Sequence, residues 1–152
     1  MSIPRAYHML IGDAIAAEAE TWVDTPFRWQ GRVKGVGCDC KGLVAGVAAA
    51  CGRPEADSVE ALAADYGDWR PVDANRLRSG LARLFDRVTD RQPGDILLVR
   101  LAGKSQHLAI AAPKDGKPSR VIETLNVGPM RVRPFRRSDA EIDSIWRWRE
   151  DQ

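Results

Sequence analysis

The pattern of apolar and polar positions divides the chain into a helical half and a half made of strands. Before residue 91 the apolar positions recur every three or four residues, as on one face of a helix. After it, short apolar runs alternate with turns that contain glycine or proline. We predict helices over residues 4–23, 40–51, 58–66 and 73–85, and strands over 96–101, 107–112, 120–125, 130–135 and 144–149. Helices followed by an antiparallel meander of about five strands indicate an α+β fold.

The predicted helix at residues 40–51 is the most informative segment. Asp39 is a suitable N-cap, and Gly52 provides a stop signal at the other end. The helix is rich in alanine and glycine and has no charge after Lys41, so we expect it to be buried against the sheet. Cys40 lies in its first turn, where the positive end of the helix dipole favours a thiolate. This combination indicates a nucleophile presented by a core helix.

Composition and charge describe an ordinary globular chain. The 152 residues suit a single domain, residues 1–152, with 44% hydrophobic and 29% charged residues. The formal net charge is only +2, from 23 basic and 21 acidic residues that are interspersed. We therefore expect no nucleic-acid partner. A local basic cluster is interpreted as a solvated face and consists of Arg131, Arg133, Arg136 and Arg137.

The cysteine pattern bears on compartment and on metals. Three cysteines cannot all pair, so free thiols are expected. The start of the chain lacks a secretory pattern, and no apolar run reaches membrane-spanning length. We expect synthesis in the cytoplasm, no membrane span, and export by something other than its own signal. The spacing of Cys38, Cys40, Cys51 and His107 does not match a zinc site, and no metal or cofactor is expected.

Cysteine catalysis also needs an imidazole and a polar group that orients it. His107 opens a predicted core strand, whereas His8 lies on the first predicted helix and is interpreted as a surface histidine. Glu123 is the single ionisable residue in the middle of the next strand, so its carboxylate needs a partner, and an imidazole is the obvious one. Asn126, just past that strand, is the alternative orienting residue.

Five sequence blocks follow one another along the chain. They are Thr-Pro-Phe-Arg-Trp-Gln-Gly at 25–31, Gly-Cys-Asp-Cys-Lys-Gly-Leu-Val at 37–44, Pro-Gly-Asp-Ile-Leu at 93–97, His-Leu-Ala-Ile at 107–110 and Val-Ile-Glu-Thr at 121–124. In this order and spacing they resemble the NlpC-type cell-wall peptidases, which are papain-like cysteine endopeptidases that cut peptidoglycan stem peptides. The chain looks closest to the branch encoded in phage, prophage and gene-transfer-agent tail modules. The resemblance covers nearly the whole chain.

The resemblance implies a role for several residues. Cys40 would be the nucleophile, His107 the general base, and Glu123 would occupy the place of the third polar residue. Asp39 matches an aspartate associated with binding the free amine of the substrate. Phe27, Trp29 and Lys41 are expected beside the substrate, with Trp29 interpreted as part of the core or groove wall.

Three residues depart from the family pattern. Glu123 stands where the family commonly has His, Asn or Gln, and Lys41 stands where a serine is frequent. The ammonium of Lys41 would lower the pKa of the Cys40 thiol further. Phe27 replaces a frequent tyrosine, so the oxyanion donors would be backbone N–H groups at the helix start.

The resemblance implies an endopeptidase that cuts the γ-D-glutamyl–diaminopimelate bond of peptidoglycan, needs no cofactor and has phage-tail proteins as partners. Such a protein would act at the cell wall when a virion or tail particle carries it. Two alternatives stay open. One is a structural tail-assembly protein that keeps the fold without turnover, and the other is a papain-like amidase or acyltransferase.

Overall fold

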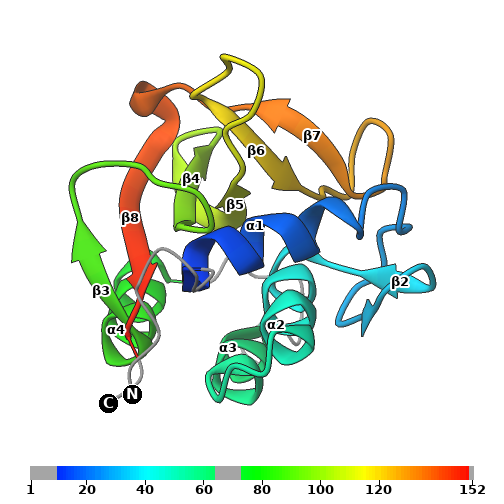
Figure 1. The fold of residues 1–152 in the computed structure, drawn as a ribbon, viewed down its shortest axis with the longest axis horizontal. Helices are drawn as coiled ribbons and strands as arrows, with labels where there is room; N and C mark the ends of the chain where they lie inside the picture. Colours follow the sequence, from blue (N-terminus) through cyan, green and yellow to red (C-terminus); the bar gives the residue numbers. More distant parts are fainter. Residues whose placement is uncertain (1–9, 64–72, 151–152) are drawn as a thin grey trace, which may run out of the picture.

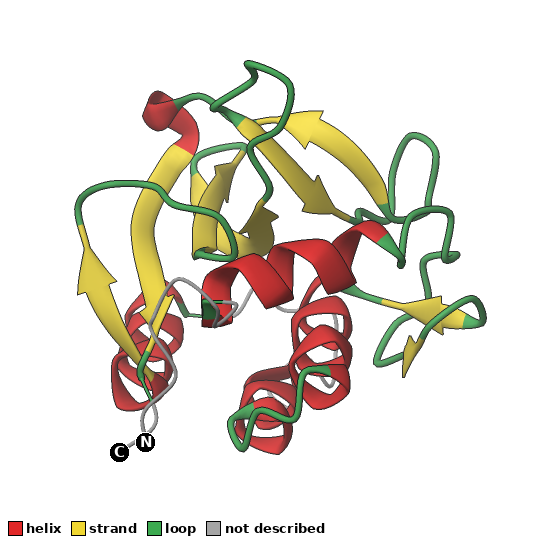
Figure 2. Ribbon diagram, viewed as in Figure 1, coloured by secondary structure: helices red, strands yellow, loops and turns green. Residues whose placement is uncertain are grey.

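Helices occupy one side of the protein and a strongly curved antiparallel sheet occupies the other (Figure 1). The computed structural model describes residues 10–63 and 73–150. Figure 2 separates the two kinds of element by colour. The α+β class predicted from the sequence is confirmed.

The predicted helices are present with shifted ends. They are α1 (Ile11–Glu20), α2 (Cys40–Ala50), α3 (Ala56–Ala63) and α4 (Ala74–Leu84). The predicted start of the first helix near residue 4, with His8, lies outside the described residues, as does the predicted end of the third at residue 66. Asp73 caps α4 by accepting a hydrogen bond from the Asn75 N–H at 2.9 Å.

Helix α2 is the buried centre of the helical side. Every residue from Cys40 to Ala48 is buried, as expected for a helix that lacks charge after Lys41. Helix α2 packs against α1, α3 and β5. Its approach to the end of α1 requires glycine, because a Cβ on Gly46 would lie 2.2 Å from the Trp22 ring.

The large sheet has six strands within the described residues, one more than predicted. They are β3 (Phe85–Val88), β4 (Ile96–Leu101), β5 (Lys104–Ala111), β6 (Arg120–Glu123), β7 (Arg133–Arg136) and β8 (Ile142–Trp148), in the order β3-β8-β4-β5-β6-β7. The added strand, β3, follows α4 without a loop. Strand β8 lies between β3 and β4, so the expected meander holds only for β4 to β7. Its alternating burial places Trp146 and Trp148 in the core shared with the helices.

Three shorter elements were not predicted. Strands β1 (Arg32–Val33) and β2 (Gly37–Cys38) form a small hairpin directly before α2. The 3-10 helix η3 (Asp139–Glu141) precedes β8 and carries a capping box between Ser138 and Glu141.

The sheet buries apolar side chains on both faces, which explains the continuous apolar run of β4. Ile96 and Leu98 join the core that the helices cover. Leu97 and Val99, which alternate with them, belong to a second cluster made of sheet residues. In the described part of the chain, no helix has the length and apolar character needed to cross a bilayer.

Candidate active site

Cys40 is the first residue of α2, and its neighbour Asp39 fixes the start of this helix. One carboxylate oxygen of Asp39 accepts a hydrogen bond from the Gly42 N–H at 2.7 Å. The other accepts from the Gln30 N–H at 2.8 Å. Asp39 therefore joins the preceding loop to the helix and is itself buried. Its expected contact with a substrate amine stays a prediction, and both of its oxygens already hold the nucleophile in place.

A close backbone approach keeps the same loop against α2. A Cβ on Gly42 would lie 1.7 Å from the carbonyl oxygen of Gly31, so a larger residue at this position cannot be accommodated without movement of the backbone. The Gly31 carbonyl also accepts from the Asp39 N–H at 3.3 Å. Gly31 and Gly42 thus set the position of Cys40 relative to the loop.

The structure brings Cys40, His107 and Glu123 together, although they are far apart in the sequence. The Cys40 sulfur lies close enough to the His107 ring for each group to shift the pKa of the other. On strand β5, His107 directs Nε2 to Glu123 Oε1 at 3.2 Å. A carboxylate can only accept, so Nε2 carries the proton and Nδ1 is the nitrogen left for the sulfur. Asn126, the alternative orienting residue, is exposed in the turn after β6.

The site is largely buried, and its charges stabilise one another. Burial opposes ionisation of Cys40, but the nearby Lys41 charge and the interaction with His107 outweigh it and lower the pKa of the thiol. Burial likewise opposes the charged form of His107, while its bonds to Cys40 and Glu123 raise the pKa of the ring. The arrangement favours a thiolate–imidazolium pair. Cys40 is buried, with 8% of its surface exposed.

Lys41 has no exposed surface. The substrate contact expected for it stays a prediction, and in the structure it acts on Cys40 through its charge. Burial lowers the pKa of its ammonium, and the negative charges of Cys40 and Asp39 offset only part of this effect. The sequence resemblance placed Lys41 beside the substrate because its position follows the nucleophile, but the helix turns this side chain inward.

Arg137 is the site residue that sequence reasoning missed. The sequence places it in a basic cluster that is expected to be solvated, but it is 7% exposed and donates to Glu123 from two nitrogens. The other three members of that cluster are exposed or half-buried. The available signal was the pairing of β6 with β7, which sets Arg133 opposite Glu123 and places Arg137 just after the paired strand. This signal is useful only when the register of the hairpin is known.

Phe27 and Trp29 lie on the loop that precedes α2. Their rings meet edge to face with centroids 5.0 Å apart, and Phe27 donates its backbone N–H to the Met130 carbonyl. Trp29 is 56% exposed, so it is not part of the core, while Trp146 and Trp148 are. Met130 and Val127 are also exposed. The role of Phe27 and Trp29 as a groove wall stays a prediction.

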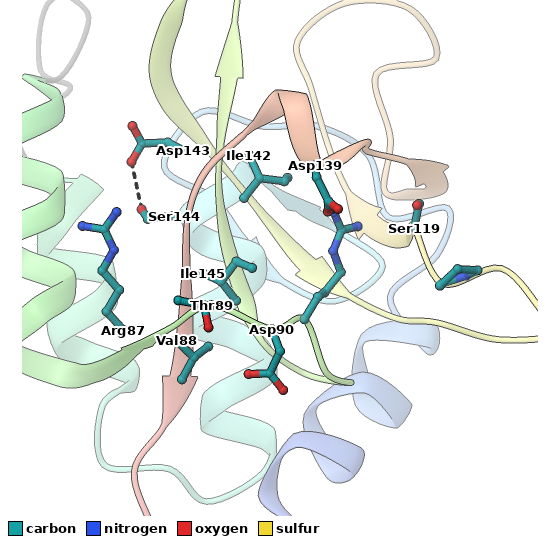
Figure 3. Close-up of a pocket in the computed structure, with 12 residues that line it drawn as sticks. Arg87, Val88, Thr89, Asp90, Ser119, Asp139, Ile142, Asp143, Ser144 and Ile145 are labelled. Atoms are coloured by element: carbon teal, nitrogen blue, oxygen red, sulfur yellow. Dashed lines mark hydrogen bonds and ion pairs between the residues drawn. The ribbon is translucent and has the colours of Figure 1, made fainter.

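A cavity of about 630 Å³ opens elsewhere, between the β3–β4 loop, the start of β6 and strand β8 (Figure 3). Its lining does not include Cys40, His107 or Glu123; it is formed by residues 87–91, 118–119, 139 and 142–145. Cys38, Cys40 and Cys51 are all free thiols. Within the ranges 10–63 and 73–150, no group of three His, Cys, Asp or Glu residues could hold a metal ion.

Comparison with solved structures identifies the fold. No protein-family model matches the sequence, and no curated protein matches it significantly. The NlpC/p60 domain of the peptidoglycan hydrolase SagA is similar over 90% of this chain and 98% of its own, with a TM-score of 0.57 and 22% identity. The peptidoglycan hydrolase RipB from Mycobacterium tuberculosis is similar over 95% of this chain and 68% of its own, with a TM-score of 0.58 and 18% identity.

A third similar structure is the P60 domain of an antigen from M. avium paratuberculosis. It covers 90% of this chain and 91% of its own, with a TM-score of 0.54 and 16% identity. Each of these structures is described as an NlpC/p60 or P60 domain or as a peptidoglycan hydrolase. The chain has the fold of the NlpC/p60 domains.

Proposed function

We propose that this chain is a cysteine endopeptidase that hydrolyses stem peptides of peptidoglycan. The observation that carries the proposal is the arrangement of three side chains: the Cys40 sulfur lies beside the His107 ring, and the same ring is hydrogen-bonded to Glu123. A nucleophile, a base beside it and an acid that orients the base are the parts that thiol peptidases need. The NlpC/p60 fold, shared with structures described as peptidoglycan hydrolases, supports the substrate class.

The geometry suggests the course of the reaction. The Cys40 thiolate attacks the peptide carbonyl, and a tetrahedral intermediate forms with its oxyanion near the start of α2. The first N–H groups of a helix have no partner within the helix, so they are suited to stabilise this charge. His107 gives its proton to the leaving amine, and the C–N bond breaks to leave a thioester. His107 then takes a proton from water, which hydrolyses the thioester and regenerates Cys40.

The finer assignments depend on the sequence resemblance. We propose that the bond cleaved is the γ-D-glutamyl–diaminopimelate bond, and that the protein works as a phage or prophage tail-associated hydrolase at the cell wall. Digestion of purified peptidoglycan tests the bond directly. Mass spectrometry of the released peptides should reveal products with a newly freed amine on diaminopimelate. Products cut at another bond would contradict this assignment.

The Cys40→Ala variant tests the endopeptidase proposal itself. Removing the thiol should lower peptide release by about 10³-fold or more, because no other group can form the thioester. The half-buried thiol Cys51 offers a matched control, since it lies at the far end of α2. Cys51→Ala should keep wild-type activity. Peptide release by a folded Cys40→Ala protein at the wild-type rate would refute the proposal.

A further inference from the structure

Arg137 holds the Glu123 carboxylate with a two-pronged hydrogen bond. Its Nε donates to Glu123 Oε1 at 2.8 Å, and its Nη2 donates to Oε2 at 2.6 Å. Glu123 has no exposed surface, so these hydrogen bonds are shielded from solvent. Planar pairing of a guanidinium with a carboxylate fixes direction as well as charge. The carboxylate that faces His107 is therefore set in one orientation.

Arg137 is itself fixed from several directions. Its backbone N–H donates to the Ser119 carbonyl at 3.0 Å, and its own carbonyl accepts from Arg91 at 2.9 Å. Its remaining guanidinium nitrogen, Nη1, donates to Glu141 at 2.9 Å. The guanidinium also lies over the Phe135 ring, 4.7 Å from its centroid. A side chain held in this way is preorganised and does not need to be ordered when a substrate binds.

The charges around Glu123 explain why it needs an arginine. The charged groups that act on it are His107 from β5 and Arg137, with Glu141 beyond Arg137, and Arg133 is its partner on the neighbouring strand β7. Behind His107 lie Asp39, Cys40 and Lys41 at the start of α2. The charge of an imidazolium is already matched by the Cys40 thiolate. Arg137 is then the cation that compensates the buried carboxylate, and an uncompensated carboxylate in such a place becomes protonated.

We propose that Arg137 is a positioning residue of the active site, which keeps Glu123 ionised and aimed at His107 so that the ring presents its other nitrogen to Cys40. This inference depends on the proposed function only for its effect on turnover. Its effect on Cys40 can be measured without peptidoglycan. Burial would raise the pKa of Glu123, yet the bonds from His107 and Arg137 lower it to about 2, so Glu123 should not titrate in the wild type at working pH.

The test is the pH dependence of Cys40 alkylation by iodoacetamide, followed by mass spectrometry of the Cys40 peptide. In the wild type the rate should fall in a single step on the acid side. In Arg137→Met, burial without the arginine should bring the Glu123 pKa above its ordinary value of about 4.3. Protonated Glu123 no longer favours the imidazolium, so a second step should appear at higher pH. Turnover of peptidoglycan fragments by this variant should fall roughly 10-fold to 100-fold.

Three further variants separate positioning from bulk stability. The second step should vanish in Glu123→Gln/Arg137→Met, which has no carboxylate to titrate and remains informative if Arg137→Met does not fold. Arg137→Lys keeps the positive charge but cannot form the paired hydrogen bonds of a guanidinium. Its alkylation profile should show no second step, and its kcat should be lower at unchanged KM. Arg136→Met changes the adjacent exposed arginine and should match the wild type in both assays.

The outcomes distinguish this inference from the endopeptidase proposal. A wild-type alkylation profile in folded Arg137→Met, or wild-type turnover in the double variant, would overturn the positioning role. A second step in a protein that releases no peptides would support the positioning role and count against the hydrolase. Peptide release by the wild type, with the same alkylation profile in the wild type and in Arg137→Met, would support the hydrolase and count against the positioning role.

Discussion

Two buried carboxylates in this protein each accept two hydrogen bonds from one arginine. Arg147 donates to Asp95 from Nε at 3.0 Å and from Nη2 at 2.9 Å, much as Arg137 does to Glu123. Both acids are buried, and both arginines come from a later part of the chain. By contact type alone the two pairs have the same role.

The third partner of each carboxylate separates them. Asp95 also accepts from the Gln92 N–H at 2.8 Å, so it closes the turn before β4 and ties it to β8. Glu123 accepts instead from Nε2 of His107, whose ring lies beside the Cys40 thiol and interacts with it. The function of a buried ion pair is thus set by what else the carboxylate touches. Asp95 belongs to one of the blocks on which the family resemblance depends, and its contacts here are structural.

The largest contrast should come from neutralising each acid. Glu123→Gln should lower kcat/KM by about 10²-fold to 10⁴-fold, because the ring loses the acceptor that fixes its tautomer and stabilises its charge. Asp95→Asn should lower stability while leaving kcat/KM of the folded enzyme near wild type. Activity assays paired with thermal unfolding measure both effects. Equal losses of activity in the two variants would remove the distinction.

Truncating the arginine of the structural pair should affect folding and not the site. Arg147→Met leaves Asp95 buried without its cation, which should cost roughly 1–3 kcal/mol in the free energy of unfolding. Urea unfolding measures this loss. The Cys40 alkylation profile of Arg147→Met should keep the single acid step of the wild type. A second step there would mean that any loss of stability disturbs Cys40, and the effect of Arg137→Met would lose its meaning.

The Glu123 pair should contribute to the acid sensitivity of the folded protein. The folded protein lowers the pKa of Glu123 from 4.5 to about 2, chiefly through the bonds from His107 and Arg137 that outweigh burial. A lowered pKa stabilises the folded state above pH 4.5, and this contribution is lost as the pH falls toward about 2. Unfolding free energies measured across this window should fall more steeply in the wild type than in Glu123→Gln/Arg137→Met. Parallel curves would contradict the lowered pKa.

The smallest effect is expected for an arginine outside both pairs. Arg136 is exposed on β7, next to Arg137. Arg136→Met should change the unfolding free energy by less than about 0.5 kcal/mol, since no buried charge is left behind. A loss as large as that of Arg147→Met would show that the basic segment matters as a whole.

Local patterns in the sequence were sufficient for the α2 site. The cap at Asp39, the apolar spacing after Cys40 and the glycine stop all act within a few residues, and the structure has each of them. The continuous run at β4 was likewise recognised because both faces of that strand are buried. The pairing of His107 with Glu123 could be suggested because both lie on adjacent predicted strands.

Pairing between segments that are distant in the sequence could not be predicted from local patterns. The insertion of β8 between β3 and β4 depends on contacts across more than forty residues, for which no local pattern exists. The burial of Arg137 has the same origin, because it follows from how the β6–β7 hairpin and η3 fold back on Glu123. The inward turn of Lys41 is also set by tertiary packing, since propensity and charge alone indicate a surface lysine.

The most direct measurement compares Cys40 with Cys38, two residues away. Burial, with the charges of Asp39 and Cys40, raises the pKa of Cys38 to about 12, whereas the surroundings of Cys40 lower its pKa. Site-resolved alkylation of the native protein between about pH 5 and pH 9 brackets the ordinary thiol value of about 8.5. We expect Cys40 to react well below that value, in a manner that His107→Ala abolishes, while Cys38 stays unmodified. Reaction of Cys40 only above it, unaffected by His107→Ala, would contradict an activated nucleophile at this site.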